Sequence, residues 1–272
     1  MKKNQLTSKR LNPNSGIEDW YVKELKKLTS QMTKECEREL TKIYKKGYSE
    51  ITFSEDESIS SQARIALNSL YNKYEQKFSK RAKTLAQSLL NKNNRYASWQ
   101  FLKVLKKMVG ENANGFSMKG SAITPEKEEI IKAAIFENVS LIKSIQSEYF
   151  KQITGAVARS IENGDGLKYL TDQLISFGAK SKRRAELIAQ DQTRKTYNSI
   201  NLRNFQEANI KKFEWVHSGG SRDPRPYHKN VLDGQIFDVD KGAPTEDGTR
   251  YIYPGQEPYC RCIMKAVLDF ED

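Results

Sequence analysis

The sequence predicts an α+β protein with a mainly helical N-terminal body and a small mixed α/β module at the C-terminus. Two observations predict this division. Apolar residues recur at three- and four-residue steps along most of the chain up to Ile210, which is the period of amphipathic helices. Beyond Ile210 that period stops, glycine and proline concentrate, and short alternating segments typical of strands follow. A chain of 272 residues can form one large domain or two modest ones.

Composition and charge restrict the classes of protein that fit. The chain carries 46 Lys and Arg against 34 Asp and Glu, a formal net charge of +12, which favours an anionic partner such as DNA or an acidic protein surface. Aromatic residues make up 10%, too many for wholesale disorder. Three cysteines do not make a secreted disulfide framework, so we expect a reducing compartment. A polar start and the lack of long apolar runs predict a protein made in the cytoplasm with no membrane partner.

A variable helical region is predicted over residues 16–120, after a mobile polar arm at 1–15. Apolar stripes at 17–46 and 61–90 repeat with the helical period, and Asn91-Lys92-Asn93-Asn94 is predicted to interrupt the second one. Stripes of this length normally pack against one another. Because the region has so few turns to bring its faces together, we expect part of its apolar surface to need a partner, and the first half to be the less protected part of the free protein.

A second helical region, 121–210, is predicted to lead into the C-terminal module. Thr124-Pro125 begins a long stripe over 126–162, and its one polar member, Asn138, is interpreted as a hydrogen-bonded core residue that fixes register. A short helix capped by Gly178 is predicted to follow.

Ser181 is then predicted to cap a further, basic helix. Lys182, Arg183 and Arg184 at its start would oppose the helix dipole, so they are either solvated or kept for an anionic partner. These three are the candidate DNA-binding residues. Any DNA binding is expected to be electrostatic and non-specific, because no base-reading element is visible.

The module at 211–272 is predicted to contain short strands and turns. Residues 213–217 alternate as in a half-buried strand, and 263–268 suit a returning strand. Asp233-Gly234 between apolar residues is the pattern of a hairpin turn. We expect the module to fold around its large apolar residues, which are Trp215, Leu232, Ile236 and Phe237.

Residues of distinctive chemistry follow one another through this module in a fixed order: Trp215; Asp223, Arg225 and His228; Leu232, Asp233 and Gly234; Pro254; and Cys260, Arg261 and Cys262. In order and spacing they resemble the C-terminal domain of the phage Mu F-like minor head proteins (the MuF domain). That pattern runs tryptophan, Asp-x-Arg-x-x-His, Leu-Asp-Gly, a proline-containing turn and Cys-Arg-Cys. The segments beginning at Glu137 and Arg184 resemble the same family more faintly.

The resemblance implies a minor head protein, or minor capsid protein, of a tailed bacteriophage, and not an enzyme. It implies assembly in the bacterial host cytoplasm into the virion, in the phage head interior or at the portal vertex. The implied partners are the portal protein, with scaffolding or major capsid protein as further candidates. The implied roles are head morphogenesis and DNA packaging or ejection.

The polar residues of the module leave two interpretations open. Arg225 is expected to pair with Asp223 or Asp233 across a turn. Cys260, Cys262 and His228 are zinc-binding residue types, and His217 or Asp223 could supply a fourth ligand. Paired Cys-x-x-Cys elements are missing from the sequence, and Arg225 stands where some relatives carry the first cysteine of such an element. The main expectation is therefore no cofactor, with buried thiols and a hydrogen-bonded His228, and zinc is the alternative.

A different functional class also fits some of these residues. Asp and His near an Arg could form the site of a DNA-processing metal-dependent nuclease, or the chain could be a zinc-binding DNA-associated protein. The sequence has no Gly-rich phosphate loop, no His-Glu-x-x-His and no nucleophile elbow. We therefore expect no catalytic residues.

Overall fold

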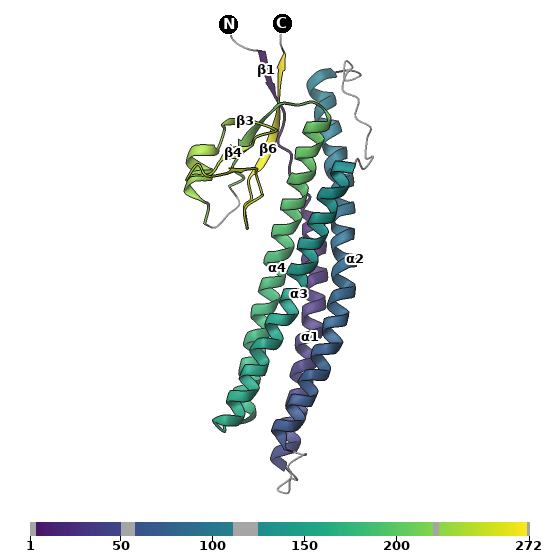
Figure 1. The fold of residues 1–272 in the computed structure, drawn as a ribbon, viewed down its shortest axis with the longest axis vertical. Coiled ribbons are helices and arrows are strands. Elements are labelled where there is room, and N and C mark those ends of the chain that lie inside the picture. The colour runs from purple at the N-terminus through teal and green to yellow at the C-terminus, as the bar shows by residue number, and fades with distance from the viewer. Residues whose placement is uncertain (1–3, 50–57, 111–124, 220–222, 271–272) are drawn as a thin grey trace. The chain divides into compact units, whose positions relative to one another are not determined.

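A computed structural model describes residues 4–49, 58–110, 125–219 and 223–270 (Figure 1). Within them the elements, in chain order, are β1 (Asn4–Thr7), α1 (Ser15–Ser49), α2 (Ile59–Val109), α3 (Pro125–Glu162), α4 (Gly166–Glu207), β2 (Lys212–Val216), the short π-helix η3 (His228–Leu232), β3 (Ile236–Asp238), β4 (Ala243–Pro244), β5 (Tyr251–Ile252) and β6 (Ile263–Phe270). The predicted α+β class, with a mainly helical body and a small sheet module, is confirmed. None of the described helices combines the length and apolarity needed to cross a membrane.

The chain forms two compact units, each built from segments that are distant in sequence. The helical unit contains residues 19–87 and 135–189, and the mixed unit contains 1–18, 88–134 and 190–272. The predicted boundaries after residues 15, 120 and 210 cut the chain into consecutive pieces instead. The boundary after residue 120 falls outside the described residues, and the predicted division stays a prediction.

The helical unit is held together by apolar stripes along its helices. The buried members include Leu25, Met32, Cys36 and Leu40 of α1, Leu67, Tyr74 and Phe78 of α2, Ile145, Tyr149 and Ile153 of α3, and Leu170, Leu174 and Ile188 of α4. The apolar stripes of α1 and α2 are therefore already covered within the chain. The reason for expecting residues 16–120 to need a partner no longer applies.

One polar pair lies inside the helical unit. The hydroxyl of Tyr21 on α1 donates to Oδ1 of Asn138 on α3 at 2.9 Å, and both side chains are buried. The interpretation of Asn138 as a hydrogen-bonded core residue is confirmed.

The predicted interruption of the second helix is wrong, because α2 continues through Asn91–Asn94. Asn93 is buried, and its Nδ2 donates to the carbonyl of Thr193 at 2.9 Å and to Oγ1 of Thr196 at 2.6 Å. A residue type that usually breaks helices is therefore used here to bind α2 to α4 within the mixed unit.

The predicted division of the next segment into two helices is also wrong, because α4 runs from Gly166 to Glu207 without a break. Gly178 lies inside it, where an added Cβ would rest in ordinary van der Waals contact 3.5 Å from Cβ of Thr33. Ser181 is a buried residue of the same helix and not its N-cap. The basic cluster Lys182, Arg183 and Arg184 is therefore mid-helix, and the argument from the helix dipole does not apply to it.

The mixed unit contains a four-stranded antiparallel sheet in the order β1-β6-β2-β3 and a separate β4-β5 pair. Strand β1 pairs with β6 so that Leu6 lies opposite Leu268, and the Ser8 amide donates to the Ala266 carbonyl at 2.8 Å. Leu11 is fully buried. Over residues 4–15 the expected mobile arm is therefore wrong: its polar composition conceals an edge strand that is held by backbone hydrogen bonds.

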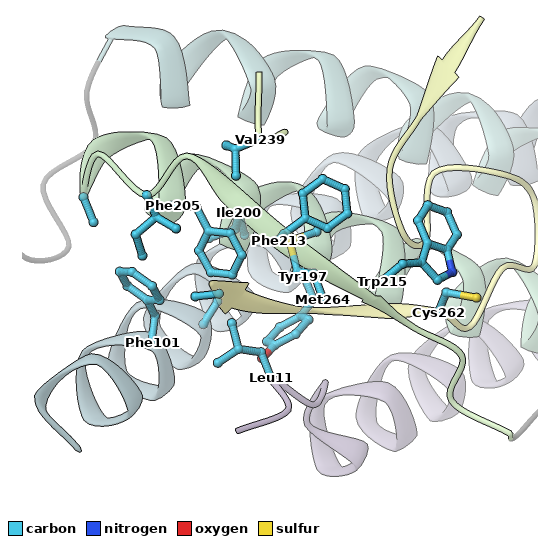
Figure 2. Packing of buried hydrophobic residues seen from close by; sticks show 14 of the residues in the cluster. Leu11, Phe101, Tyr197, Ile200, Phe205, Phe213, Trp215, Val239, Cys262 and Met264 are labelled. Carbon is cyan, nitrogen blue, oxygen red and sulfur yellow. The ribbon is translucent and has the colours of Figure 1, made fainter. Parts of the chain in front are cut away.

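Aromatic residues from the sheet and the helices form the core of the mixed unit (Figure 2). Trp215 and Leu232 are buried as predicted, and Phe237 packs against the cluster while partly exposed. Ile236 was expected in this core, but its side chain is 42% exposed because it points to the open face of edge strand β3. The turn at Gly234 exists, with φ +77°, but helix η3 precedes it, so it does not form the predicted hairpin.

Candidate metal centre

Two histidines and two cysteines meet beside the ends of β2 and β6 in the mixed unit. The Sγ atom of Cys260 lies 3.6 Å from Nδ1 of His228, and Sγ of Cys262 lies 3.9 Å from the same nitrogen. On its other side, Sγ of Cys262 lies 3.8 Å from Nδ1 of His217. His228, Cys260 and Cys262 are buried, and their potential ligand atoms all lie within 4.8 Å of one another. The structure thus brings together the three main candidates, and it places His217, one of the two residues proposed as a fourth ligand, beside Cys262.

The backbone around the cysteines is shaped by helix α4. The side chain of Asn198 donates to the Cys262 carbonyl at 3.1 Å, and Oδ1 of Asp191 accepts from the Tyr259 amide at 2.5 Å. Gly255 has φ +78°, and a Cβ added there would overlap the amide nitrogen of Asn198. The Pro254-Gly255 turn of the sequence motif is therefore a place where the chain passes α4 too closely for any side chain.

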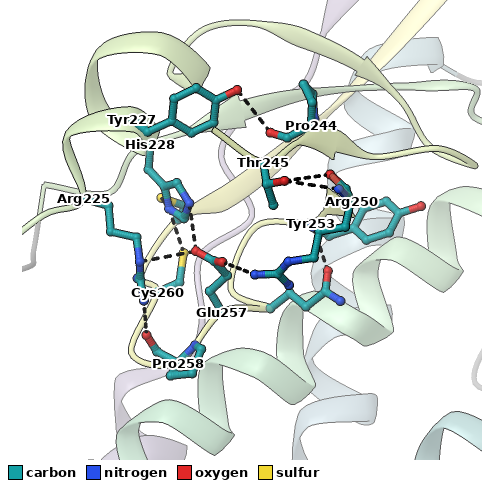
Figure 3. A network of polar contacts seen from close by, with 12 residues as sticks. Arg225, Tyr227, His228, Pro244, Thr245, Arg250, Tyr253, Glu257, Pro258 and Cys260 are labelled. Atoms are coloured by element: carbon teal, nitrogen blue, oxygen red, sulfur yellow. Dashed lines mark hydrogen bonds and ion pairs between the residues drawn. The ribbon is translucent and has the colours of Figure 1, made fainter. Parts of the chain in front are cut away.

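Glu257 is the centre of an ion-pair network beside the cysteines (Figure 3). Its Oε2 lies 3.2 Å from Nε2 of His228 and 3.3 Å from Nε of Arg225, while Oε1 lies 2.7 Å from Nη2 of Arg250. Arg225 also donates to the carbonyl of Pro258 at 2.9 Å. His228 is therefore held on both sides, with Nε2 toward a carboxylate and Nδ1 toward two thiols.

The predicted partner of Arg225 was wrong. It pairs with Glu257, while Asp233 accepts a hydrogen bond from the backbone amide of His217 at 2.7 Å. Sequence reasoning missed Glu257, although it is the only acidic residue between Pro254 and Cys262. A single acidic residue in the turn before the cysteines was the available signal.

The two thiols influence each other's ionisation. Hydrogen bonds from Cys262 and from His228 lower the pKa of Cys260 to about 4, although burial acts in the opposite direction. The pKa of Cys262 is raised by its hydrogen bond to Cys260 and by burial. The two thiols thus shift each other's pKa in opposite directions, which favours the thiolate on Cys260. Trp215 packs beside His228 and Cys262. Its ring centroid lies 5.1 Å from that of His228, and Figure 2 shows its indole next to Cys262.

The cluster opens onto a cavity of about 320 Å³, which is lined by His217, Asp223, Pro224, Arg225, His228 and the segment from Pro258 to Cys262. A solute can therefore reach the buried sulfur atoms from this side. A set of two thiols and two imidazoles that faces one point can bind a soft divalent metal, whereas a single thiol with a histidine and a carboxylate can act as a nucleophile. Asp223 lines the same cavity but is not among the side chains that contact the sulfurs.

The remaining predicted site residues fall into two groups. Leu232, Asp233, Gly234, Pro254 and Arg261 surround the cluster as core, turn and cavity residues. The candidate DNA-binding residues lie in the helical unit, where Arg183 pairs with Glu186 at 3.3 Å and Arg184 donates to Oγ of Ser144 at 2.9 Å.

Comparison with known protein families agrees with the sequence motif that runs from Trp215 to Cys262. Residues 151–265 match the family model described as Phage Mu protein F like protein, and that range includes His217, His228, Glu257 and both cysteines of the cluster. Residues 151–265 belong to the phage Mu F-like family. This membership supports a part in phage head morphogenesis, in a family that is generally structural.

A similar protein is found in Haemophilus influenzae, where it is described as an uncharacterized protein. It is 28% identical over 265 residues, which cover 96% of this chain and 55% of the relative. The chain thus spans about half the length of that relative. No solved structure matches the chain.

Proposed function

We propose that this chain is a minor head protein of a tailed phage that binds the portal vertex of the procapsid and takes part in DNA packaging or delivery. The observation that carries the proposal is the family match over residues 151–265, which contains the whole cluster around Glu257. The proposed location is the head interior or the portal vertex, and scaffolding or major capsid protein are further candidate partners.

The geometry favours a structural role over catalysis for this cluster. Arg225, His228 and Arg250 all point at the one carboxylate of Glu257 (Figure 3). Side chains that neutralise one another in this way hold a fold together and leave few groups for a substrate. The alternative of a metal-dependent nuclease would need carboxylates that face a metal, and Glu257 faces two arginines instead.

Surface residues of the helical unit offer candidate contacts for a protein partner. Large apolar side chains stand out from three of its helices: Ile65 on α2 is 62% exposed, Phe136 on α3 is 79% exposed and Ile175 on α4 is 56% exposed. Single exposed apolar residues are common on monomers, so each is a candidate to be tested separately.

Co-sedimentation tests the proposal. The full chain is mixed with the portal protein of the same virus and pelleted at about 50 mM and about 300 mM salt, with an unrelated protein of similar positive charge as the control. We expect co-sedimentation at both salt concentrations. Failure to pellet, or pelleting only at low salt as in the control, would contradict portal binding.

The same assay locates the contact. Phe136→Ser is compared with Lys132→Ser, an exposed change one turn earlier on the same helix. If α3 contacts the portal, the first variant weakens binding and the second does not. Equal binding by both would place the contact elsewhere without affecting the main proposal.

A second candidate function is non-specific DNA contact, which is favoured by the net charge of +12. Retention on DNA should fall by orders of magnitude between about 50 and 200 mM salt if several phosphates are contacted. Lys182→Ala should lower the salt dependence if the basic cluster on α4 takes part. Sequence-selective binding that is independent of salt would contradict this interpretation.

A further inference from the structure

We propose that His217, His228, Cys260 and Cys262 bind a zinc ion in the mixed unit. The inference does not depend on the proposed role in phage heads. It rests on the positions of four donor atoms, on the orientation of His228 and on the access given by the cavity.

Three pairs of donor atoms already have nearly the spacing of a tetrahedral site. Zinc–sulfur and zinc–nitrogen bonds of about 2.3 and 2.05 Å place neighbouring sulfur and nitrogen ligands about 3.5 Å apart. The observed sulfur–nitrogen distances are 3.6, 3.8 and 3.9 Å. For these three pairs, closing the site requires movements of a few tenths of an ångström. His228, Cys260 and Cys262 form the mutually close group, and His217 joins it through Cys262.

The donors also balance the charge of the ion. Two thiolates and two neutral imidazoles around Zn²⁺ give a site with no net charge, which a buried position tolerates. Two arginines beside His228, Arg225 and Arg250, pair with Glu257.

The surroundings of His228 match those of a metal ligand. Metal-bound histidines commonly donate the other ring N–H to a carboxylate, which fixes the tautomer and the ring orientation. Here Nε2 of His228 faces Oε2 of Glu257 at 3.2 Å, and the tautomer that carries its proton on Nε2 would direct the Nδ1 lone pair toward the two sulfurs. The backbone of His217 is fixed as well, by the hydrogen bond to Asp233. Glu257 is therefore a positioning residue for the site.

A metal would supply what this part of the fold lacks. Between β3 and β6 the only described regular elements are the two-residue strands β4 and β5. A segment with so little regular structure gains stability from a metal that links its turn to strand β2 and helix η3. The cavity of about 320 Å³ gives the ion a path to the sulfurs.

The same atoms allow one competing interpretation. Cys260, His228 and Glu257 are arranged like a nucleophile, its base and the group that orients the base. Two features favour metal binding: a second thiol lies beside the same imidazole with a second imidazole next to that thiol, and the Cys260 residue is only 4% exposed. The experiment separates the two by their response to zinc and to alkylation.

The full chain is purified from zinc-supplemented cells, and its zinc is measured by mass spectrometry. The matched control is Cys36→Ser, which changes the third buried cysteine, a residue of the helical unit. We expect about one zinc per chain in the wild type and in Cys36→Ser, and loss of zinc in Cys260→Ser and Cys262→Ser. Zinc retained equally by all four proteins would overturn the site.

Two further variants keep both thiols, so that the test does not depend on cysteine variants that fail to fold. His217→Gln should weaken zinc binding but leave three ligands. Glu257→Gln should lower zinc affinity by roughly 10–100-fold, because it removes the partner of a ligand and not a ligand. Unchanged affinity in both variants would overturn the assignment of the fourth ligand and of the positioning residue.

Cobalt and alkylation complete the test on the wild-type chain. Cobalt(II) added to the metal-free protein should give the intense absorption of thiolate-to-cobalt charge transfer, and bound zinc should slow alkylation of Cys260 and Cys262 by iodoacetamide. A wild type that contains no zinc, gives no cobalt band and is rapidly alkylated at Cys260 alone would overturn the metal site in favour of a nucleophile.

Discussion

The helical unit and the mixed unit are stabilised in different ways. In the helical unit, long helices bury repeated apolar positions, and ion pairs such as Lys26–Glu186 at 3.0 Å lie near the surface. In the mixed unit, short strands and turns surround a buried cluster of sulfur, imidazole and carboxylate groups. Stability is thus spread over many equivalent contacts in one unit and depends on a few irreplaceable residues in the other.

This difference explains why a glycine, a histidine or a tryptophan has more influence in the mixed unit. On a helix surface, several positions can make similar contacts. A turn with a positive φ, or a contact between two rings, depends on one residue at one position. Substitutions matched between the two units, or between buried and exposed positions of one unit, should reveal the contrast directly.

The largest effect is expected from Trp215→Ala. Trp215 is fully buried against His228 and Phe237, and truncation of such an aromatic residue costs about 3–5 kcal/mol, enough to unfold a small unit. The matched control is Trp99→Ala in the same unit, whose side chain is 55% exposed. Denaturant unfolding followed by circular dichroism measures both, and a Trp215→Ala protein as stable as the control would contradict this account of the core.

A smaller but still clear effect is expected from Gly255→Ala, compared with Gly164→Ala. Both glycines have positive φ, but an added Cβ meets nothing within 4 Å at Gly164, whereas at Gly255 it overlaps Asn198. The control should cost about 1–2 kcal/mol from backbone strain alone, and Gly255→Ala should cost more. Equal losses in thermal unfolding would show that the close approach to α4 is unimportant.

The next change should have the opposite sign. Gly178 lies inside α4 with room for a methyl group beside Thr33, so Gly178→Ala should stabilise the helical unit by up to about 1 kcal/mol. If the residue instead capped a short helix in a left-handed conformation, alanine would destabilise the protein. The direction of the change in Tm therefore distinguishes the continuous helix from the predicted pair of helices.

The smallest effect concerns acid stability of the helical unit. Hydrogen bonds from Lys73 and then from Tyr74 hold the pKa of Glu35 below its usual value of 4.5. A depressed pKa stabilises the fold above pH 4.5, and this contribution is lost as the pH falls through the folded-state pKa. Because the pair is partly exposed, we expect less than about 1 kcal/mol. Glu35→Gln should flatten stability between pH 6 and 3, and an unchanged pH profile would exclude this contribution.

Much of the helical unit could be predicted from the sequence, because its evidence is a repeated period. The stripes of α1 and α3, and the hydrogen-bonded role of Asn138, follow from that period. The errors came from predicting helix ends from single residues without their tertiary contacts. In the helical unit, Gly178 has low helix propensity, but one glycine is not enough to end a long helix. In the mixed unit, a buried hydrogen bond holds Asn93 within α2.

The mixed unit was predicted from its motif of distinctive residues and not from a repeated apolar period. Trp215, His228, Cys260 and Cys262 were recognised as a set, with His217 or Asp223 as a possible addition. The pairing of Arg225 with Glu257 and the choice between His217 and Asp223 depend on how turns distant in sequence meet. Strand β1 escaped prediction for a similar reason: its partner, β6, lies at the opposite end of the chain. Long-range pairing of short segments leaves little trace in local sequence.

Both units are expected to be folded by their own contacts before any partner binds. Hydrogen exchange on the free chain tests this most directly, because protection reports local opening. We expect slow exchange both in the buried turns of α1 and α2 between residues 19 and 87 and in β2 and β6, with little change in these segments when portal protein is added. Fast exchange across residues 19–87 in the free chain, with protection only after portal binding, would contradict the account.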